Sequence, residues 1–102
     1  MANYTNESIQ RLMKAIALAE TEEECKALFD DLCTIKELQN MAMRLDTAIL
    51  LSEGVNYLDI SQQTGASTTT ISRVSRCYNY GDGGYKNIIR KLKETENEDA
   101  DQ

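Results

Sequence analysis

A face rich in hydroxyl and guanidinium groups on residues 68–78 carries the most distinctive chemistry in the sequence. If this segment is helical, its apolar side consists of Ile71, Val74, Ser75 and Tyr78. The opposite side has no acid and carries Thr69, Ser72, Arg73 and Arg76, with Thr68 and Thr70 at its flanks. Hydroxyls and arginines donate hydrogen bonds to phosphates and base edges, and threonine methyls can touch thymine methyls. The pattern therefore predicts a helix that reads the major groove of DNA.

The residues before this helix predict a partner for it. Residues 57–64 have helical spacing, with an expected inner face of Tyr57, Ile60, Ser61 and Thr64. Gly65 follows as a left-handed residue that ends the helix, and Ser67 is suited to cap the next one. The segment at about 57–78 is therefore predicted to be a helix-turn-helix, with Gln62 and Ser67 as further candidate DNA contacts. The alternative is a plain helical hairpin whose polar face meets water, because two inner-face residues are polar where apolar ones are usual.

Charge is distributed unevenly, although the whole chain has a net charge of −6. Residues 1–56 hold five Lys or Arg against ten Asp or Glu, and residues 94–102 hold five acids alone. Residues 57–93 hold six cations against two acids. Because surface fields are screened over about 10 Å in physiological salt, a local basic patch can bind phosphates on an acidic protein.

Helices are expected along nearly the whole chain. The 102 residues include no proline and show little strand-like alternation, which predicts a single all-α domain over residues 1–93. Besides the segment above, helices are predicted at about 5–19, 22–32, 35–52 and 85–93. Capping boxes at Thr21 with Glu24 and at Thr34 with Glu37 open the second and third of them. Glycines 81, 83 and 84 predict a turn, and residues 94–102 are expected to be an acidic disordered tail.

Several function classes lack the residues that they need. Without histidine, the chain has no Ser-His or Cys-His pair and no histidine metal ligand, so we expect no enzyme, metal or cofactor. The cysteines, Cys25, Cys33 and Cys77, lack close C-x-x-C pairs and are interpreted as reduced core or near-core thiols. A redox or metal role for them is the alternative. No apolar run approaches the ~20 residues of a membrane span and no signal peptide is recognisable, so the predicted location is cytoplasmic with no membrane partner.

The helix predicted at residues 35–52 is apolar over more of its circumference than one packing face requires. Such a helix is buried by several neighbours, and in a chain this short some of them can belong to a second copy. A monomeric bundle closed by the N-terminal helix is the other interpretation. The pattern alone leaves both open.

About half of the chain, from Leu32 to Tyr80, resembles the Trp-repressor superfamily, and the full layout looks like the small Trp-repressor-like proteins of the YerC/YecD type. The resemblance rests on the segments CTIKELQNMAMRLDTAILLSEG, GASTTTISRVS and CYNYGDGGY. It implies an all-helical, intertwined homodimer that presents two helix-turn-helix units to adjacent major grooves of double-stranded DNA. A two-fold dimer would bind a palindromic operator with half-sites about 34 to 36 Å apart.

The resemblance also bears on effector binding. In the Trp repressor two arginines flank the bound indole ring, and Arg44 and Arg73 match them. Val74 follows the second arginine here, where the tryptophan-binding repressor has a glycine that leaves room for the ligand. We therefore expect no tryptophan-like effector, which would leave Arg73 free to contact DNA.

These observations favour a dimeric, sequence-specific DNA-binding regulator, and a repressor in particular. Its base-reading residues would be Thr68, Thr69, Thr70, Ser72 and Arg73. Arg76 and the cations of the last helix would hold phosphates. Two alternatives remain: a helical dimeric adaptor that binds proteins without binding DNA, and a repressor gated by a small ligand at Arg44 and Arg73.

Overall fold

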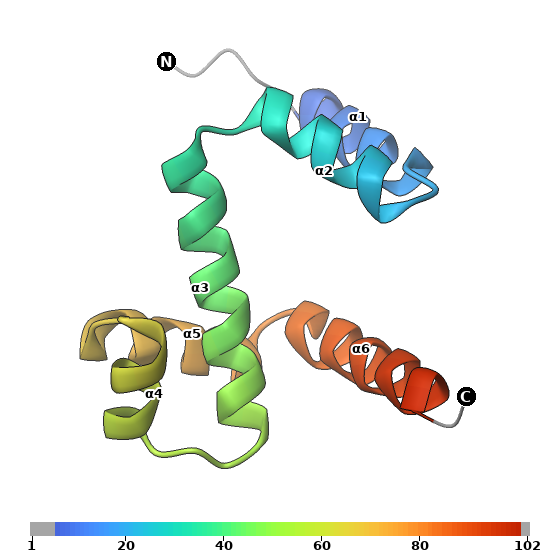
Figure 1. The fold of residues 1–102 in the computed structure, drawn as a ribbon. Coiled ribbons are helices and arrows are strands. Elements are labelled where there is room, and N and C mark those ends of the chain that lie inside the picture. The colour runs from blue at the N-terminus through green and yellow to red at the C-terminus, as the bar shows by residue number, and fades with distance from the viewer. Residues whose placement is uncertain (1–5, 101–102) are drawn as a thin grey trace, which may run out of the picture. The chain divides into compact units, whose positions relative to one another are not determined.

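The computed structural model describes residues 6–100, and within that range the chain is built from helices without strands (Figure 1). In chain order they are α1 (Asn6–Leu18), α2 (Glu22–Leu32), α3 (Ile35–Ser52), α4 (Tyr57–Thr64), α5 (Thr68–Tyr80) and α6 (Gly84–Ala100). The all-α class expected from the sequence is confirmed. None of these described helices is both long and apolar enough to cross a membrane.

The chain divides into two compact units, Met1–Leu38 and Gln39–Gln102, where its length alone predicts one domain. The boundary follows the first turn of α3. The first unit contains α1 and α2, and the second contains α4, α5, α6 and most of α3. All of the residues predicted to contact DNA belong to the second unit.

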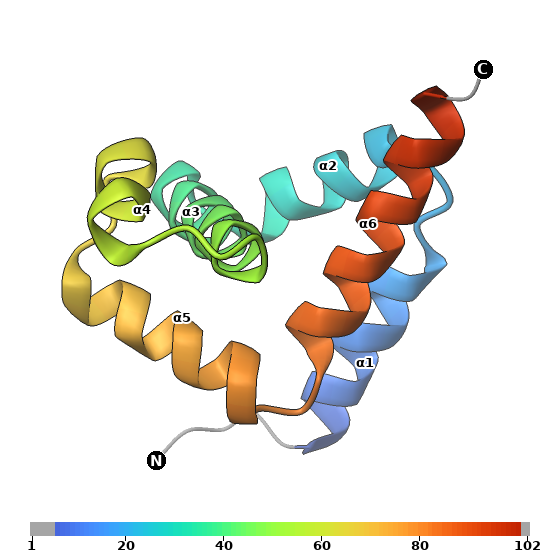
Figure 2. The same cartoon turned by 90° about the horizontal axis from the view of Figure 1, so that it is seen from below.

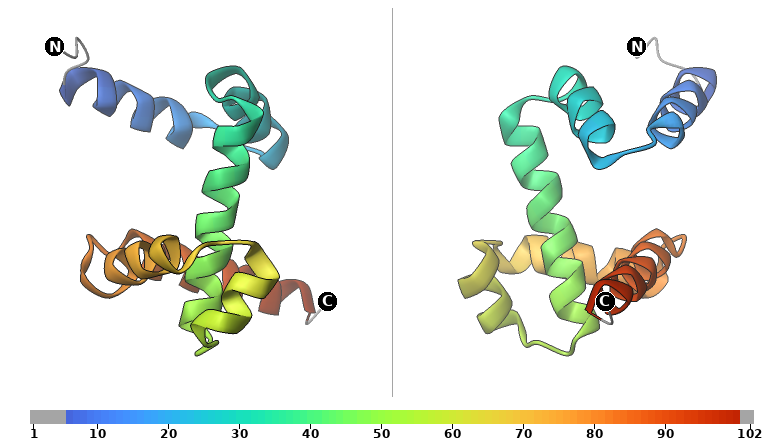
Figure 3. Two further views of the ribbon diagram at one scale, coloured as in Figure 1. Left: turned by 90° about the vertical axis from the view of Figure 1, so that its left-hand side faces the viewer. Right: turned by 45° about the vertical axis from the view of Figure 1, so that its right-hand side comes forward.

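In the first unit, α1 and α2 are joined by residues 19–21 and diverge from this connection (Figure 3). Thr21 caps α2, because its hydroxyl accepts a hydrogen bond from the backbone N–H of Glu24 at 3.0 Å. The Glu24 carboxylate accepts from the backbone N–H of Glu20 at 2.7 Å, one residue earlier than a capping box requires. The predicted cap is therefore confirmed, with its return bond shifted by one residue.

The start of α3 is capped reciprocally by Thr34 and Glu37, as predicted. The Thr34 backbone N–H donates to the Glu37 carboxylate at 2.8 Å, and the Glu37 N–H donates to the Thr34 hydroxyl at 3.1 Å. Hydrogen bonding of the carboxyl to the Thr34 backbone, and next to the Thr34 side chain, lowers the pKa of Glu37 below its ordinary value of 4.5. The ionised carboxylate therefore stabilises the first turn of α3.

Two clusters of buried side chains hold α4, α5 and α6 against α3 in the second unit (Figures 1 and 2). The first cluster consists of Ile60, Ala66 and Ile71, with Met43, Leu50, Leu51 and Val55 packed against it. The second consists of Ala48, Val74 and Ile89, with Leu45, Ile49, Leu51, Tyr78 and Tyr85 around it. Because the C-terminal half of α3 contributes to both clusters, it positions the three later helices together.

The connection between α4 and α5 is fixed at each of its residues. Gly65 adopts the left-handed conformation, with φ of 78°, and its N–H donates to the Ser61 carbonyl at 2.9 Å. Ala66 is buried, with 1% of its surface exposed. The Thr64 hydroxyl donates to the Ile60 carbonyl at 2.8 Å and accepts from the Ala66 N–H at 3.1 Å. A polar residue at this inner position is therefore satisfied by its own helix and turn.

Three residues of this region differ from the sequence prediction. Tyr57 was predicted on the inner face of α4 but is 39% exposed, because it begins the helix and Val55 packs against the core cluster instead. The prediction for Tyr57 was wrong. Thr47 and Ala66 were not predicted to be in the core, yet they are 0% and 1% exposed. Thr47 is tolerated there because its hydroxyl donates to the Met43 carbonyl at 2.8 Å.

The last helix is longer than expected. The sequence predicts an end near residue 93, whereas α6 continues to Ala100 and includes most of the acidic segment expected to be disordered. Bonds one turn apart link the extension to the basic part: Arg90 pairs with Glu94 at 2.9 Å, and the Thr95 hydroxyl donates to the Lys91 carbonyl at 2.9 Å. Residues 101–102 of the predicted tail, like the predicted helix start at Thr5, lie outside the described residues.

All three cysteines are free thiols, but they do not share one environment. Cys25 and Cys33 are half-buried, which agrees with near-core positions. Cys77 is exposed, so its prediction as a core thiol was wrong. Cys77 lies three residues after the buried Val74 on α5, but the core side chains that cover Val74 do not cover Cys77.

Candidate nucleic-acid interface

The side of α5 that faces away from the core is exposed. Ile71 and Val74, 0% and 2% exposed, fix the rotation of the helix about its axis. The polar residues exposed on the other side are Thr68, Thr69, Ser72, Arg73 and Arg76. We call the line formed by Thr69, Ser72, Arg73 and Arg76 the outward row. No acidic residue occurs anywhere in α5, so no carboxylate on the helix itself opposes an approaching phosphate.

Three other predicted contacts have different surroundings. Ser67 is the N-cap of α5: its oxygen accepts from the Thr70 backbone N–H at 3.1 Å, and its hydroxyl donates to the Thr70 side-chain oxygen at 3.1 Å. Thr70 is half-buried, so both hydroxyls serve the helix start. Gln62 is exposed on α4. The structure therefore assigns Ser67 and Thr70 to the cap of α5, although Ser67 is itself exposed.

The basic groups differ in how far they are already engaged. Within the described residues, neither Arg73 nor Arg76 has an ion pair or a hydrogen bond through its side chain, and the same holds for Lys91. Arg90 is held by Glu94 at 2.9 Å and by the Asn87 side chain at 2.8 Å. Cations without partners on the protein are the ones free to neutralise phosphates.

The remaining two cations of α6 face the protein. Lys93 donates to the Ser52 hydroxyl at 3.2 Å, where a positive charge near the C-terminus of α3 complements the helix dipole. Lys86 lies over the Tyr78 ring, with its nitrogen 5.4 Å from the ring centroid. Of the α6 cations expected to reach phosphates, Lys93, Lys86 and Arg90 thus already have neighbours on the protein.

Tyr80, the last residue of α5, is 86% exposed. It follows Thr69 by eleven positions, which brings it back to nearly the same direction around the helix at about 100° per residue. It therefore extends the outward row beyond Arg76. Tyr80 lies beyond the helix end at residue 78 that the sequence predicts, although the helical periodicity that places it is present in the sequence.

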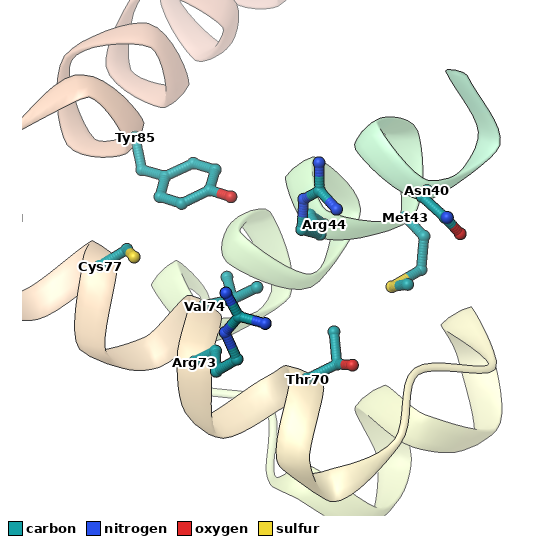
Figure 4. A pocket seen from close by; sticks show the side chains of 8 residues that line it. All are labelled: Asn40, Met43, Arg44, Thr70, Arg73, Val74, Cys77 and Tyr85. Carbon is teal, nitrogen blue, oxygen red and sulfur yellow. The ribbon is translucent and has the colours of Figure 1, made fainter. Parts of the chain in front are cut away.

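The two predicted effector-binding residues, Arg44 on α3 and Arg73 on α5, line one cavity of about 360 Å³ (Figure 4). The complete lining is Asn40, Met43, Arg44, Thr70, Arg73, Val74, Cys77 and Tyr85. No acidic residue lines the cavity, which would therefore favour an anion. Arg73 belongs both to this lining and to the outward row.

Val74 closes the inner wall of this cavity and is only 2% exposed. Its side chain packs with Ala48 and Ile89 in a core cluster that joins α3, α5 and α6. The valine methyls therefore occupy space that a glycine at the same position would leave empty. The cavity is also lined by two guanidinium groups, those of Arg44 and Arg73.

Comparison with solved structures identifies the fold. A TrpR-like protein from Eubacterium eligens superposes with a TM-score of 0.83 and 39% identity, covering 87% of this chain and 92% of that one. A protein from Staphylococcus aureus proposed to be a Trp repressor gives a TM-score of 0.82 and 39% identity, with 87% and 89% covered. The chain has a TrpR-like fold.

Comparison of sequences leads to the family. The family model of the Trp repressor protein matches residues 7–93. The uncharacterised protein YerC of Bacillus subtilis is 48% identical over 92 residues, which make up 90% of this chain and 88% of the relative. The protein belongs to the Trp repressor family, as its resemblance to that superfamily indicated.

Proposed function

We propose that the protein is a DNA-binding transcriptional regulator, and specifically a repressor, that uses α4 and α5 as a helix-turn-helix. The observation that carries the proposal is the outward row of α5, which is exposed, acid-free and fixed in direction by Ile71 and Val74 beneath it. Membership of the Trp repressor family supports the same class of function.

The exposed residues divide into two kinds of contact. In a helix-turn-helix the N-terminal residues of the second helix touch base edges. Thr68, Thr69, Ser72 and Arg73 would therefore read bases, with Arg73 suited to the paired acceptors of guanine. Arg76 lies one turn further along, and with Gln62 of α4 it would contact the phosphate backbone.

We further propose that the protein acts as a homodimer on a palindromic operator. Several large apolar side chains are exposed on α1 and α6: Ile9 at 46%, Leu12 at 38%, Met13 at 52%, Ile88 at 47% and Leu92 at 39%. Apolar residues that recur on one side of a helix need a surface that covers them. A second copy of the chain supplies such a surface, so no different partner protein is required. Two-fold symmetry would place the half-sites about 34 to 36 Å apart.

Selection from random duplex DNA with the purified full-length protein tests the function directly. Enrichment of a palindrome is expected, and the recovered duplex should bind less tightly as salt rises because each phosphate contact releases counterions. Failure to enrich or retain any duplex at low salt would refute the regulator proposal. That result would favour the protein-binding adaptor, which needs no nucleic acid.

Replacing Arg73 by Ala tests the assignment of the reader. If Arg73 contacts a base, the preference for the selected duplex over a scrambled one should fall by about 1–3 kcal/mol. If it contacts a phosphate, both duplexes should lose affinity by the same smaller factor. Arg11→Ala is the matched control, because Arg11 is exposed on α1 and its replacement by Ala removes the same charge. Unchanged affinity in Arg73→Ala would exclude both roles.

A ligand-gated repressor is the second candidate, favoured by the cavity that joins Arg44 and Arg73. Thermal-shift measurements with amino acids and other small carboxylates would detect a ligand as stabilisation that grows with its excess. The shift should disappear in Arg44→Ala if the cavity is the binding site. Because Val74 occupies the inner wall, tryptophan is expected to give no shift.

A further inference from the structure

Tyr80 is an aromatic residue that the fold leaves almost uncovered. It is 86% exposed at the end of α5, and no described residue forms a polar contact with its hydroxyl. Its backbone is nevertheless well fixed, because the Gly81 N–H donates to the Cys77 carbonyl at 2.9 Å. A Cβ at residue 81 would approach the Cys77 carbonyl oxygen to 2.4 Å, so the close end of the helix depends on glycine there. Tyr80 is thus held in place by its backbone while its side chain stays free.

The neighbouring side chains at this end of α5 are already occupied. Asn79 folds back on its own helix, with its side-chain amide donating to the Ser75 carbonyl at 2.9 Å. Tyr78 is half-buried and has Lys86 over its ring. Among the aromatic residues at this end of α5, Tyr80 is therefore the one whose ring is exposed and uncovered, and its hydroxyl has no partner among the described residues.

The length of α5 determines what Tyr80 can reach. Eleven residues separate it from Thr69, which at 1.5 Å per residue is about 16 Å along the helix. The major groove is about 12 Å wide, and the N-terminal part of a recognition helix is the part that meets base edges. A side chain on the line of the outward row, about 16 Å along the helix from Thr69, therefore arrives at the sugar-phosphate wall of the groove.

We infer that Tyr80 is an additional DNA contact whose hydroxyl donates a hydrogen bond to a backbone phosphate while its ring lies against the adjoining sugar. The inference rests on the proposed DNA-binding function. It assigns Tyr80 to affinity and positioning and gives it no part in reading sequence, because a phosphate is the same at every base pair. A tyrosine hydroxyl is neutral, so this contact adds affinity without releasing a counterion.

The test compares Tyr80→Phe, Tyr80→Ala and Arg76→Ala, using the duplex recovered by selection and a scrambled duplex of equal length. Tyr80→Phe should weaken binding to both duplexes by the same factor, about ten- to hundredfold, as expected for one hydrogen bond to a charged phosphate. The slope of log affinity against log salt should stay that of the wild type. Arg76→Ala should reduce this slope by about 1 because a charge is lost. Unchanged helicity and melting temperature would establish that the exposed side chain is not needed for folding.

Each outcome decides the matter. Equal binding by wild type and both Tyr80 variants would overturn the inference and leave the proposed function intact. Weaker binding by Tyr80→Ala but not by Tyr80→Phe would overturn the phosphate contact, because the ring alone would then act. A loss confined to the selected duplex would overturn the assignment to the backbone. Absence of DNA binding by the wild type would refute the proposed function itself.

Discussion

The α4–α5 pair and the α1–α2 pair begin from the same kind of amphipathic pattern and end in different states. In α4 and α5 the apolar positions close on α3, and Ile60 and Ile71 are each 0% exposed. In α1 and α2 no residue is buried, and Ile9 and Met13 remain 46% and 52% exposed. Helical periodicity therefore establishes which side of a helix is apolar, but it does not establish which surface covers that side.

The contrast is consistent with a division of tasks. A helix that reads DNA has to present its polar side in one fixed direction, and this requires a closed core beneath it. A helix that pairs with a second copy needs the opposite, an apolar side kept open until the copy arrives. Matched substitutions in the two regions should separate these two situations, and the largest effect is expected in the closed core.

Ile71→Ala should destabilise the protein by about 2–5 kcal/mol, since it removes a fully buried side chain from the cluster with Ile60 and Ala66. Urea unfolding followed by circular dichroism measures the loss, which is expected at every protein concentration. Ile9→Ala is the matched truncation on α1. Its effect should be small in dilute protein and should grow with concentration, as for a residue covered by a second copy. Equal, concentration-independent losses would remove the distinction between the two regions.

Met13→Glu should weaken self-association by about tenfold or more, because it places a charge on the open apolar side of α1. Sedimentation equilibrium or light scattering over a range of concentrations measures the change. Lys14→Glu introduces the same residue next to it, at an exposed polar position, and is expected to alter association little. A wild type that is monomeric at all concentrations would contradict the homodimer.

The smallest expected effect concerns Glu37 at the start of α3. Its pKa is lowered in the folded state, so its contribution to stability is complete above the ordinary value of 4.5 and is lost as the pH falls through the lower folded value. Glu37→Gln should therefore show a shallower fall in melting temperature between pH 6 and strongly acidic pH. Parallel curves for wild type and variant would show that the Thr34 contact does not favour the ionised carboxylate.

The features that sequence predicted best depend on residues three or four positions apart. Thr21, Thr34 and Ser67 cap their helices, and Gly65 takes the left-handed turn, because each signal lies within the segment that it shapes. The apolar positions Ile60, Ile71 and Val74 were also predictable from spacing. The family resemblance drew on the same segments and is confirmed.

Features that depend on distant parts of the chain were harder to predict. Thr47 is buried because its own helix satisfies its hydroxyl, and Tyr57 is exposed because Val55 takes the place near the core. The division into two units depends on how many contacts each segment finds elsewhere, and spacing does not encode that number. For the candidate site, the direction of the outward row followed from periodicity. The engagement of Arg90 and Lys93 with neighbours became visible only in three dimensions.

The connection between α4 and α5 also determines how these two helices can move. Gly65 is held by its left-handed backbone conformation, Ala66 by burial and Ser67 by its cap hydrogen bond. The connection therefore has no flexible residue, and α4 and α5 should move together as a rigid body. Because Gly81 closes the end of α5, any reorientation of the pair relative to α6 has to take place beyond it, at Gly83. A substitution that restricts the backbone there would change the orientation of α4 and α5 relative to α6, while the geometry within the α4–α5 pair would stay the same.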